Sequence, residues 1–218
     1  MLRLFRFIVF MIFAIVSTAH AQNISIKEAD ARSWANNKGQ ELLLILSESN
    51  LTEKYAKLDR MMMEDVNIDY ISKFVIGKYA KFMSNEQKTR YNELFQRYIL
   101  SSYKQIDLHF DASLIKFTVD DIIEHPEFTT VKCTVDAGKL IKEADASIIP
   151  VKFKLIRGRF NRIQAVDLEI AKVSMVIEYR KRFYKMIQDE GGEIEWFLDK
   201  FDDRVRANEE NVYKNASL

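Results

Sequence analysis

The sequence predicts an α+β fold, in which a helical layer packs on a twisted antiparallel sheet. Apolar residues recur every three or four positions before residue 113 and again after residue 175, which is typical of amphipathic helices. Between these two parts the period falls to two, which is typical of strands with one apolar and one wet face. Only two prolines and six glycines interrupt the chain, so long elements and few tight turns are expected. A sheet with one apolar face needs a cover, and helices on both sequence flanks can supply it.

The first 21 residues have the composition of a secretory signal peptide. Arg3 and Arg6 precede an unbroken apolar run over residues 7–16, and the small residues Ala19 and Ala21 occupy the positions that signal peptidase reads. The run is shorter than the ~20 residues that span a bilayer, although an uncleaved anchor is the alternative. We therefore predict cleavage after Ala21 and a single exported domain over residues 22–218.

Apolar stripes locate the helices on both sides of the sheet. Before the sheet, three stripes consist of Trp34, Leu42, Ile45 and Leu46; Leu51, Tyr55, Leu58 and Met62; and Ile68, Ile71, Val75, Tyr79 and Phe82. A fourth follows Ser84 and Gln87, which have the spacing of a capping box, and consists of Tyr91, Leu94, Phe95, Tyr98 and Ile99. After the sheet, two stripes consist of Val176, Tyr179, Phe183 and Ile187, and of Ile194, Phe197, Leu198, Phe201 and Val205. Gly191 and Gly192 are expected to end the first of these two helices.

Four alternating segments predict a meander of four strands. Their apolar positions are Phe117 and Val119; Val131, Cys133 and Val135; Ile149, Val151, Phe153 and Leu155; and Val166, Leu168 and Ile170. The residues between them are mostly charged or hydroxylated, so each strand has one wet face. Periodicity alone does not distinguish a filled core from a hollow one behind the apolar face.

Residues that could carry catalysis do not form a recognisable site in the sequence. The glycines form no dinucleotide or phosphate-binding motif, and no nucleophile elbow is present. His109 and His125 lack the spacing of a metal site, although His109 between two aspartates could act as an acid or base. Asp120 and Asp121 are adjacent, so on a regular strand their carboxylates point to opposite faces. Cys133 is expected to be a buried, inert thiol. The sequence therefore predicts no enzyme, no cofactor and no metal.

The charge balance argues against a nucleic-acid partner. Losing Arg3 and Arg6 with the signal changes the formal net charge from +1 to −1, which leaves no overall basic footprint. The basic residues do cluster on one predicted hairpin, formed by Lys152, Lys154, Arg157, Arg159 and Arg162. This hairpin is either a solvated surface or a docking patch for acidic partners or anionic headgroups.

Two segments resemble the MlaC family, also called the toluene-tolerance family of periplasmic phospholipid-binding proteins. The first segment runs from Asp69 through Gly77 to Tyr79 and leads into Ser84 and Gln87, with spaced aromatics after it. The second comprises Val173-Ser174-Met175-Val176 followed by Tyr179-Arg180 and Phe183. Ala171-Lys172 departs from the family pattern, which has a glycine-containing turn before the Val-Ser pair. The resemblance covers roughly residues 42–204.

The resemblance implies an apolar cavity between sheet and helices that holds phospholipid acyl chains. It further implies a periplasmic shuttle between an outer-membrane lipoprotein complex and an inner-membrane ABC transporter complex, which maintains outer-membrane lipid asymmetry. The inward positions expected to contact lipid are Val75, Tyr79, Phe95, Ile99, Phe117, Val119, Val131, Val135, Val151, Phe153, Leu168 and Ile170. Two alternatives are a carrier of another amphiphile, such as a hopanoid, and a small-molecule enzyme on a cone-shaped α+β fold.

Overall fold

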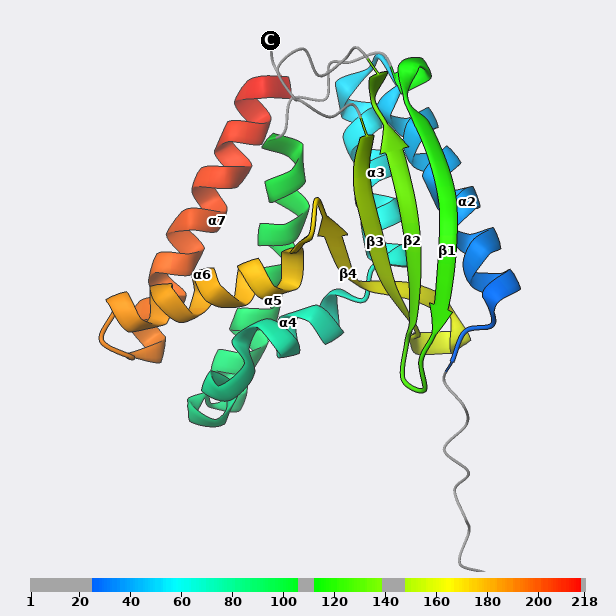
Figure 1. Cartoon of the computed structure of the whole chain (residues 1–218). Coiled ribbons are helices and arrows are strands. Elements are labelled where there is room, and N and C mark those ends of the chain that lie inside the picture. Colours follow the sequence, from blue (N-terminus) through cyan, green and yellow to red (C-terminus); the bar gives the residue numbers. More distant parts are fainter. Residues whose placement is uncertain (1–24, 106–111, 139–147, 217–218) are drawn as a thin grey trace, which may run out of the picture.

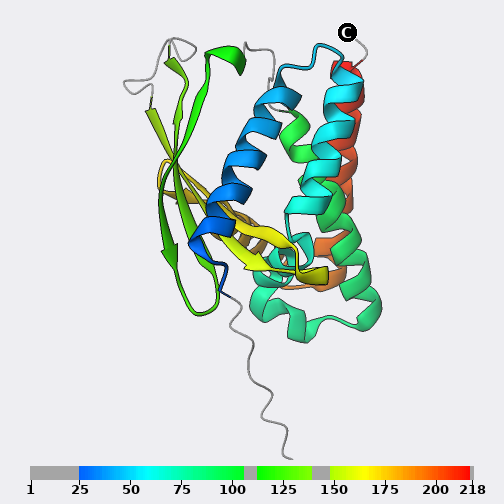
Figure 2. The same cartoon turned by 90° about the vertical axis from the view of Figure 1, so that its right-hand side faces the viewer.

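The computed structural model describes residues 25–105, 112–138 and 148–216, and in these residues a sheet and a group of helices form two layers (Figures 1 and 2). The sheet has the order β1-β2-β3-β4-β5, and every neighbouring pair is antiparallel. Helix α2 lies against one face of the sheet, and α3, α5 and α7 lie beyond it (Figure 2). The predicted α+β architecture is thereby confirmed.

The sheet is a meander with one more strand than the alternation predicted. Its strands are β1 (Lys116–Glu124), β2 (Thr129–Asp136), β3 (Ile148–Arg157), β4 (Ile163–Ile170) and the two-residue β5 (Val173–Ser174). Ala171 and Lys172 form the β4–β5 turn with φ of 49° and 71°. Glycine favours this left-handed region, so the chain adopts the expected turn with residues that are less suited to it.

Two β-bulges change the simple alternation. The pairing of β1 with β2 shifts between Val119 and Asp121, so Asp120 is an extra residue in its strand. Asp120 accepts a hydrogen bond from Thr134 and Asp121 from Lys132, at 2.6 and 2.8 Å. Thr134 and Lys132 are both on the wet face of β2, so the prediction of opposite faces for the two aspartates was wrong.

The second bulge lies where β3 pairs with β4. Asp167 pairs with Lys154, but the next pair joins Ala165 to Leu155 and leaves out Val166. The next residue on the apolar face after Leu168 is therefore Ala165. The alternation in the sequence had assigned this position to Val166. Val166 is buried but belongs to neither of the two hydrophobic clusters described below.

Two long helices come first in the described part of the chain. Helix α2 (Glu28–Leu46) packs on β1 and β2, chiefly through Ala31 and Ala35, which are fully buried. Leu42, predicted to be part of its buried stripe, is 37% exposed. Helix α3 (Leu51–Asp65) is capped by the preceding residue, Asn50, whose side chain accepts a hydrogen bond from the backbone N–H of Glu53.

The segment that follows is a short helix and a 3-10 turn rather than one continuous helix. Helix α4 (Ile68–Ile76) ends at Gly77, which has φ of 48°, and the 3-10 helix η1 (Gly77–Phe82) follows. The predicted stripe that joined Val75 to Tyr79 and Phe82 is therefore divided. Helix α5 (Asn85–Ser102) starts with the predicted capping box, in which Ser84 and Gln87 bond each other's backbone N–H groups.

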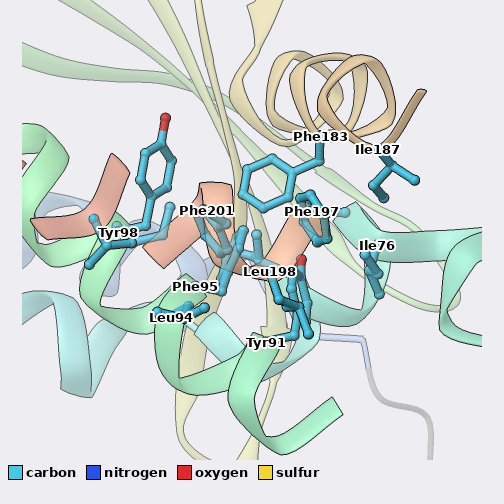
Figure 3. Close-up of a cluster of buried hydrophobic side chains, with 14 of the residues drawn as sticks. Ile76, Tyr91, Leu94, Phe95, Tyr98, Phe183, Ile187, Phe197, Leu198 and Phe201 are labelled. Atoms are coloured by element: carbon cyan, nitrogen blue, oxygen red, sulfur yellow. The ribbon is translucent and has the colours of Figure 1, made fainter. Parts of the chain in front are cut away.

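Helices α6 (Met175–Asp189) and α7 (Ile194–Ala216) complete the helical layer. The stop predicted between them is confirmed, because Gly191 and Gly192 have positive φ and the Gly192 N–H donates to the carbonyl of Ile187. Aromatic rings from α5 and α7 pack around Phe183 of α6, which has five aromatic neighbours (Figure 3). They are Tyr91, Phe95, Tyr98, Phe197 and Phe201.

Some predictions concern residues outside the described part of the chain. The predicted signal peptide over residues 1–21 and His109 lie there, so the cleavage site and the role of His109 stay predictions. Among the helices in residues 25–105, 112–138 and 148–216, none is long and apolar enough to cross a membrane.

Candidate functional site

The candidate site is the apolar face of the sheet, which we call the sheet face. Strand pairing places the alternating apolar residues of four strands on it. Phe117 lies opposite Val135, Val131 lies opposite Phe153, and Phe153 lies opposite Leu168. The sheet face comprises Phe117, Val119, Val131, Cys133, Val135, Ile149, Val151, Phe153, Leu155, Ala165, Leu168 and Ile170. The apolar positions predicted for the first three strands therefore share one face.

One end of the sheet face is closed by the N-terminal segment and by α2. Ile26 is fully buried, and its backbone N–H and C=O both bond the buried hydroxyl of Thr129, at 3.2 and 2.8 Å. Leu155 and Val131, which lie near this end, are fully buried. Further along α2, toward the opposite end of the sheet face, Gly39 lets the helix approach β1 closely, because a Cβ there would lie 2.4 Å from ring atom Cδ1 of Phe117.

The opposite end of the sheet face is increasingly open. Phe117 and Val135 are half-buried, and Ile170 at the end of β4 is 37% exposed. Leu114, which precedes β1 at this end, is more than half exposed. The sheet face is thus apolar throughout but sealed only at the end near Ile26, which leaves apolar area accessible at the other end.

Trp34 of α2 borders the partly buried part of the sheet face. Its ring contacts Phe153 edge-on, with ring centroids 6.0 Å apart. Its indole N–H is buried and has no hydrogen-bond partner among the described residues. A buried donor without an acceptor is costly, so this position would favour a ligand that brings a carbonyl or another acceptor.

The reverse face of the sheet is held by charge pairs. Lys152 pairs with Glu169 at 2.6 Å, and the Lys154 ammonium lies over the ring of Phe128. Arg157, at the end of β3, pairs instead with Asp30 of α2, the helix that covers the sheet face, at 3.1 Å. Three members of the basic hairpin therefore have local partners, and the hairpin is not one continuous free basic patch.

The four predicted lipid contacts on helices lie elsewhere. Val75, Phe95 and Ile99 are buried in a cluster formed by α4, α5, α6 and α7, which we call the helical core. Tyr79 packs at its margin, with its ring 4.9 Å from that of Tyr184. The structure therefore does not bring these four residues together with the sheet face, whose residues form a separate cluster. Whether any of the twelve predicted residues touches lipid stays a prediction.

Cys133 lies at the centre of the sheet face. Burial raises the pKa of its thiol to about 12, so the thiol is protonated at neutral pH and a poor nucleophile. In the residues that the structure describes, no group of histidine, cysteine or carboxylate side chains is arranged to hold a metal ion. The chemistry of the sheet face is therefore that of an apolar surface.

Several residues of the sheet face were not among the predicted lipid contacts. Cys133, Ile149 and Leu155 follow the same alternation as Val151 and Phe153, so the period-two pattern was sufficient to find them. Ala165 could not be found in this way, because the bulge at Val166 shifts the alternation. Trp34 is a large aromatic on a predicted helix, but no sequence signal connects it to Phe153.

Comparison with known proteins gives two positive findings. A family model described as MlaC protein matches residues 37–201. The phospholipid-binding protein from Ralstonia solanacearum, solved in complex with a phospholipid, has a similar structure, with a TM-score of 0.64 and 12% sequence identity. That likeness covers 82% of this chain and 98% of the other and supports a shared fold. No curated protein matches the chain at a significant level. Because the family model covers well over half of the sequence, the chain belongs to the MlaC family, whose members are non-enzymatic lipid-binding carriers.

Proposed function

We propose that the protein carries phospholipid across the periplasm between an outer-membrane lipoprotein complex and an inner-membrane ABC transporter complex. The observation that carries this proposal is the sheet face, which is apolar throughout but closed only at the end near Ile26. Membership of the MlaC family and the likeness to a phospholipid-bound protein support the same function.

The energetics of a carrier require such a surface. Burying one methylene contributes ~0.8 kcal/mol, so two acyl chains of ~30 methylenes would cost ~25 kcal/mol to expose to water. A bilayer is as apolar as a protein interior, so transfer from membrane to protein is nearly balanced in free energy. This balance allows both loading and release, and it requires only an apolar surface that chains can enter from one side.

In this proposal the acyl chains lie along the sheet face, between the strands and α2. They enter beside Ile170, which is partly exposed at the end of β4, and reach toward the closed end near Ile26. Trp34 stands beside Phe153, two residues from Leu155 near the closed end, so its ring would border the deep part of the acyl chains. Binding through apolar area does not discriminate between headgroups, so phospholipids of several headgroup classes should be carried.

The direct test is to identify what the protein carries. Protein purified from the periplasmic fraction, beginning at Gln22, is analysed by native mass spectrometry and by lipid extraction. We expect phospholipid with diverse headgroups, at about one lipid per protein. Protein without bound lipid, even after incubation with phospholipid vesicles, would contradict the proposal. Recovery of another amphiphile alone, such as a hopanoid, would replace phospholipid as the cargo.

A further inference from the structure

A pocket in the helical layer is distinct from the sheet face in its chemistry. It lies where α5, α6 and α7 meet and has a volume of about 450 Å³. Its lining consists of Tyr98, Ser102, Tyr179, Arg182, Arg204 and Asn208. Every one of these side chains can donate a hydrogen bond and none carries a carboxylate. The described lining is thus suited to an anion.

The two arginines of this pocket have no acidic partner among the described residues. The Arg204 guanidinium has one hydrogen-bond partner among the described residues, the sulfur of Met186, at 3.8 Å. Other arginines that face α7 are paired: Arg97 with Glu209, and Arg206 with Asp202, each at 2.7 Å. Arg182 and Arg204 therefore stand out from their neighbours as cations that remain free for a ligand.

Two tyrosine hydroxyls add donors beside these cations. The rings of Tyr98 and Tyr179 pack edge-on, 6.0 Å apart, and neither hydroxyl has a hydrogen-bond partner in the described part of the chain. The hydroxyl of Tyr98 points away from the packed rings of the helical core (Figure 3). Burial raises the pKa of Tyr179, so this hydroxyl stays protonated and able to donate.

The side chains of Ser102 and Asn208, which complete the lining, are held in place by a short chain of hydrogen bonds. The Ser102 hydroxyl donates to the carbonyl of Tyr98 at 2.6 Å, and the Asn208 side-chain amide donates to Ser102 at 3.4 Å. These contacts join the end of α5 to α7 at the pocket wall. The donors are therefore attached to packed helices rather than to loops.

We propose that this pocket binds a phosphate group, with the guanidinium groups of Arg182 and Arg204 and the hydroxyls of Tyr98 and Tyr179 as its donors. Guanidinium groups suit phosphate because their N–H groups match its oxygens in pairs. The phosphate can belong to a lipid headgroup, a source that rests on the proposed function, or to free inorganic phosphate.

The position of the pocket is compatible with a lipid headgroup. Helix α6 begins directly after β5, and Asp167 of β4 fixes its start by bonding the hydroxyl of Ser174 at 2.7 Å. Arg182 follows Met175 by two helical turns, which is about 10 Å along α6 from the edge of the sheet. A headgroup at the pocket and acyl chains at the sheet face can thus belong to one molecule.

The test removes both positive charges of the pocket. The double variant Arg182→Gln/Arg204→Gln is compared with wild type and with Lys73→Gln/Lys88→Gln, which removes two exposed cations elsewhere. Circular dichroism checks that all three are folded. After lipid extraction, titration calorimetry measures the Kd for inorganic phosphate. In a second arm, each protein is loaded from phosphatidylglycerol vesicles, and phospholipid per protein is measured after gel filtration.

We expect the pocket variant to bind inorganic phosphate at least tenfold more weakly than wild type, while the control variant is unchanged. A several-fold loss of phosphatidylglycerol in the same variant would identify the headgroup as the source, whereas an unchanged lipid load would identify free phosphate. Equal phosphate binding and equal lipid load in the pocket and control variants would overturn the site and leave the carrier function intact. Arginine-dependent phosphate binding without lipid in any protein would retain the site and overturn the carrier function.

Discussion

Neighbouring residues on β3 have opposite environments. Phe153 lies between Val131 and Leu168 on the sheet face, whereas Lys152 pairs with Glu169 on the reverse face. Since successive side chains of a strand point to opposite faces, a shift of one residue in register would exchange these environments completely. The proposed lipid-binding role of the sheet face therefore depends on the register at this residue.

We predict that Phe153→Asp empties the protein of lipid. The substitution places a carboxylate where acyl chains are proposed to lie, and an unpaired charge in an apolar site costs several kcal/mol. Because the sheet face is partly open, water can relieve some of this cost, so the variant should stay folded. Lipid per protein, measured by mass spectrometry beside circular dichroism, should fall to a small fraction of the wild-type value.

Thr130→Asp is the matched control for this experiment. It adds the same charge to the adjacent strand, but Thr130 lies opposite Lys154 on the reverse face. Its lipid content should equal that of wild type, because only a solvated charge changes. If both variants are folded and retain lipid equally, the sheet face does not hold the acyl chains.

Helix α5 is the element that supports the helical core. Its apolar stripe is buried over its whole length, and the hydroxyl of Tyr91 donates to the carbonyl of Ser72 on α4 at 3.0 Å. The capping box at Ser84 and Gln87 satisfies backbone donors that the first turn would otherwise leave unpaired. The start of α5 is thereby determined by local hydrogen bonds, independently of the packing of its far end.

Replacing the cap should therefore have a local and measurable cost. Ser84→Ala removes the acceptor for the Gln87 N–H, and we expect the free energy of unfolding to fall by about 1 kcal/mol. Urea denaturation measures the change. The control is Thr52→Ala at an exposed position in the first turn of α3, which should be neutral or slightly stabilising because alanine favours helix. Equal effects of the two substitutions would show that the capping box contributes nothing.

In the whole molecule, two hydrophobic clusters have different degrees of closure. The helical core is densely packed, and its central ring, Phe183, contacts aromatic rings on both α5 and α7. The sheet face includes several half-buried residues and is open at one end. Stability and ligand binding are thus expected to depend on different parts of the fold.

This division predicts that a substitution in the helical core separates stability from binding. Phe183→Leu removes aromatic contacts from the packed cluster, and we expect a loss of about 1–3 kcal/mol in unfolding free energy. Lipid per protein should remain at the wild-type level at temperatures where the variant is folded. Urea denaturation and lipid extraction on the same preparation provide both measurements. A folded Phe183→Leu protein without lipid would show that the helical core takes part in binding.

The sequence alone determined the type of most elements and the faces of most strands. Alternation placed Val131, Val151 and Phe153 on one face, and the capping box located the start of α5, because both signals act over a few residues. The family followed from short segments of local sequence for the same reason. Where an extra residue entered a strand, at Asp120 and at Val166, the period of two failed: Asp120 and Asp121 both bond the wet face of β2, and Ala165 takes the place assigned to Val166.

Only the tertiary structure decided which apolar surfaces meet. Val75 and Phe95 have the same apolar character as Val131 and Phe153, yet they pack in the helical core because α4, α5, α6 and α7 enclose it. Arg182 and Arg204 lie on different helices, and the pocket that they line exists only where α5, α6 and α7 meet. Local patterns report which side of an element is apolar or charged, but the partner of that side depends on contacts between residues far apart in the chain.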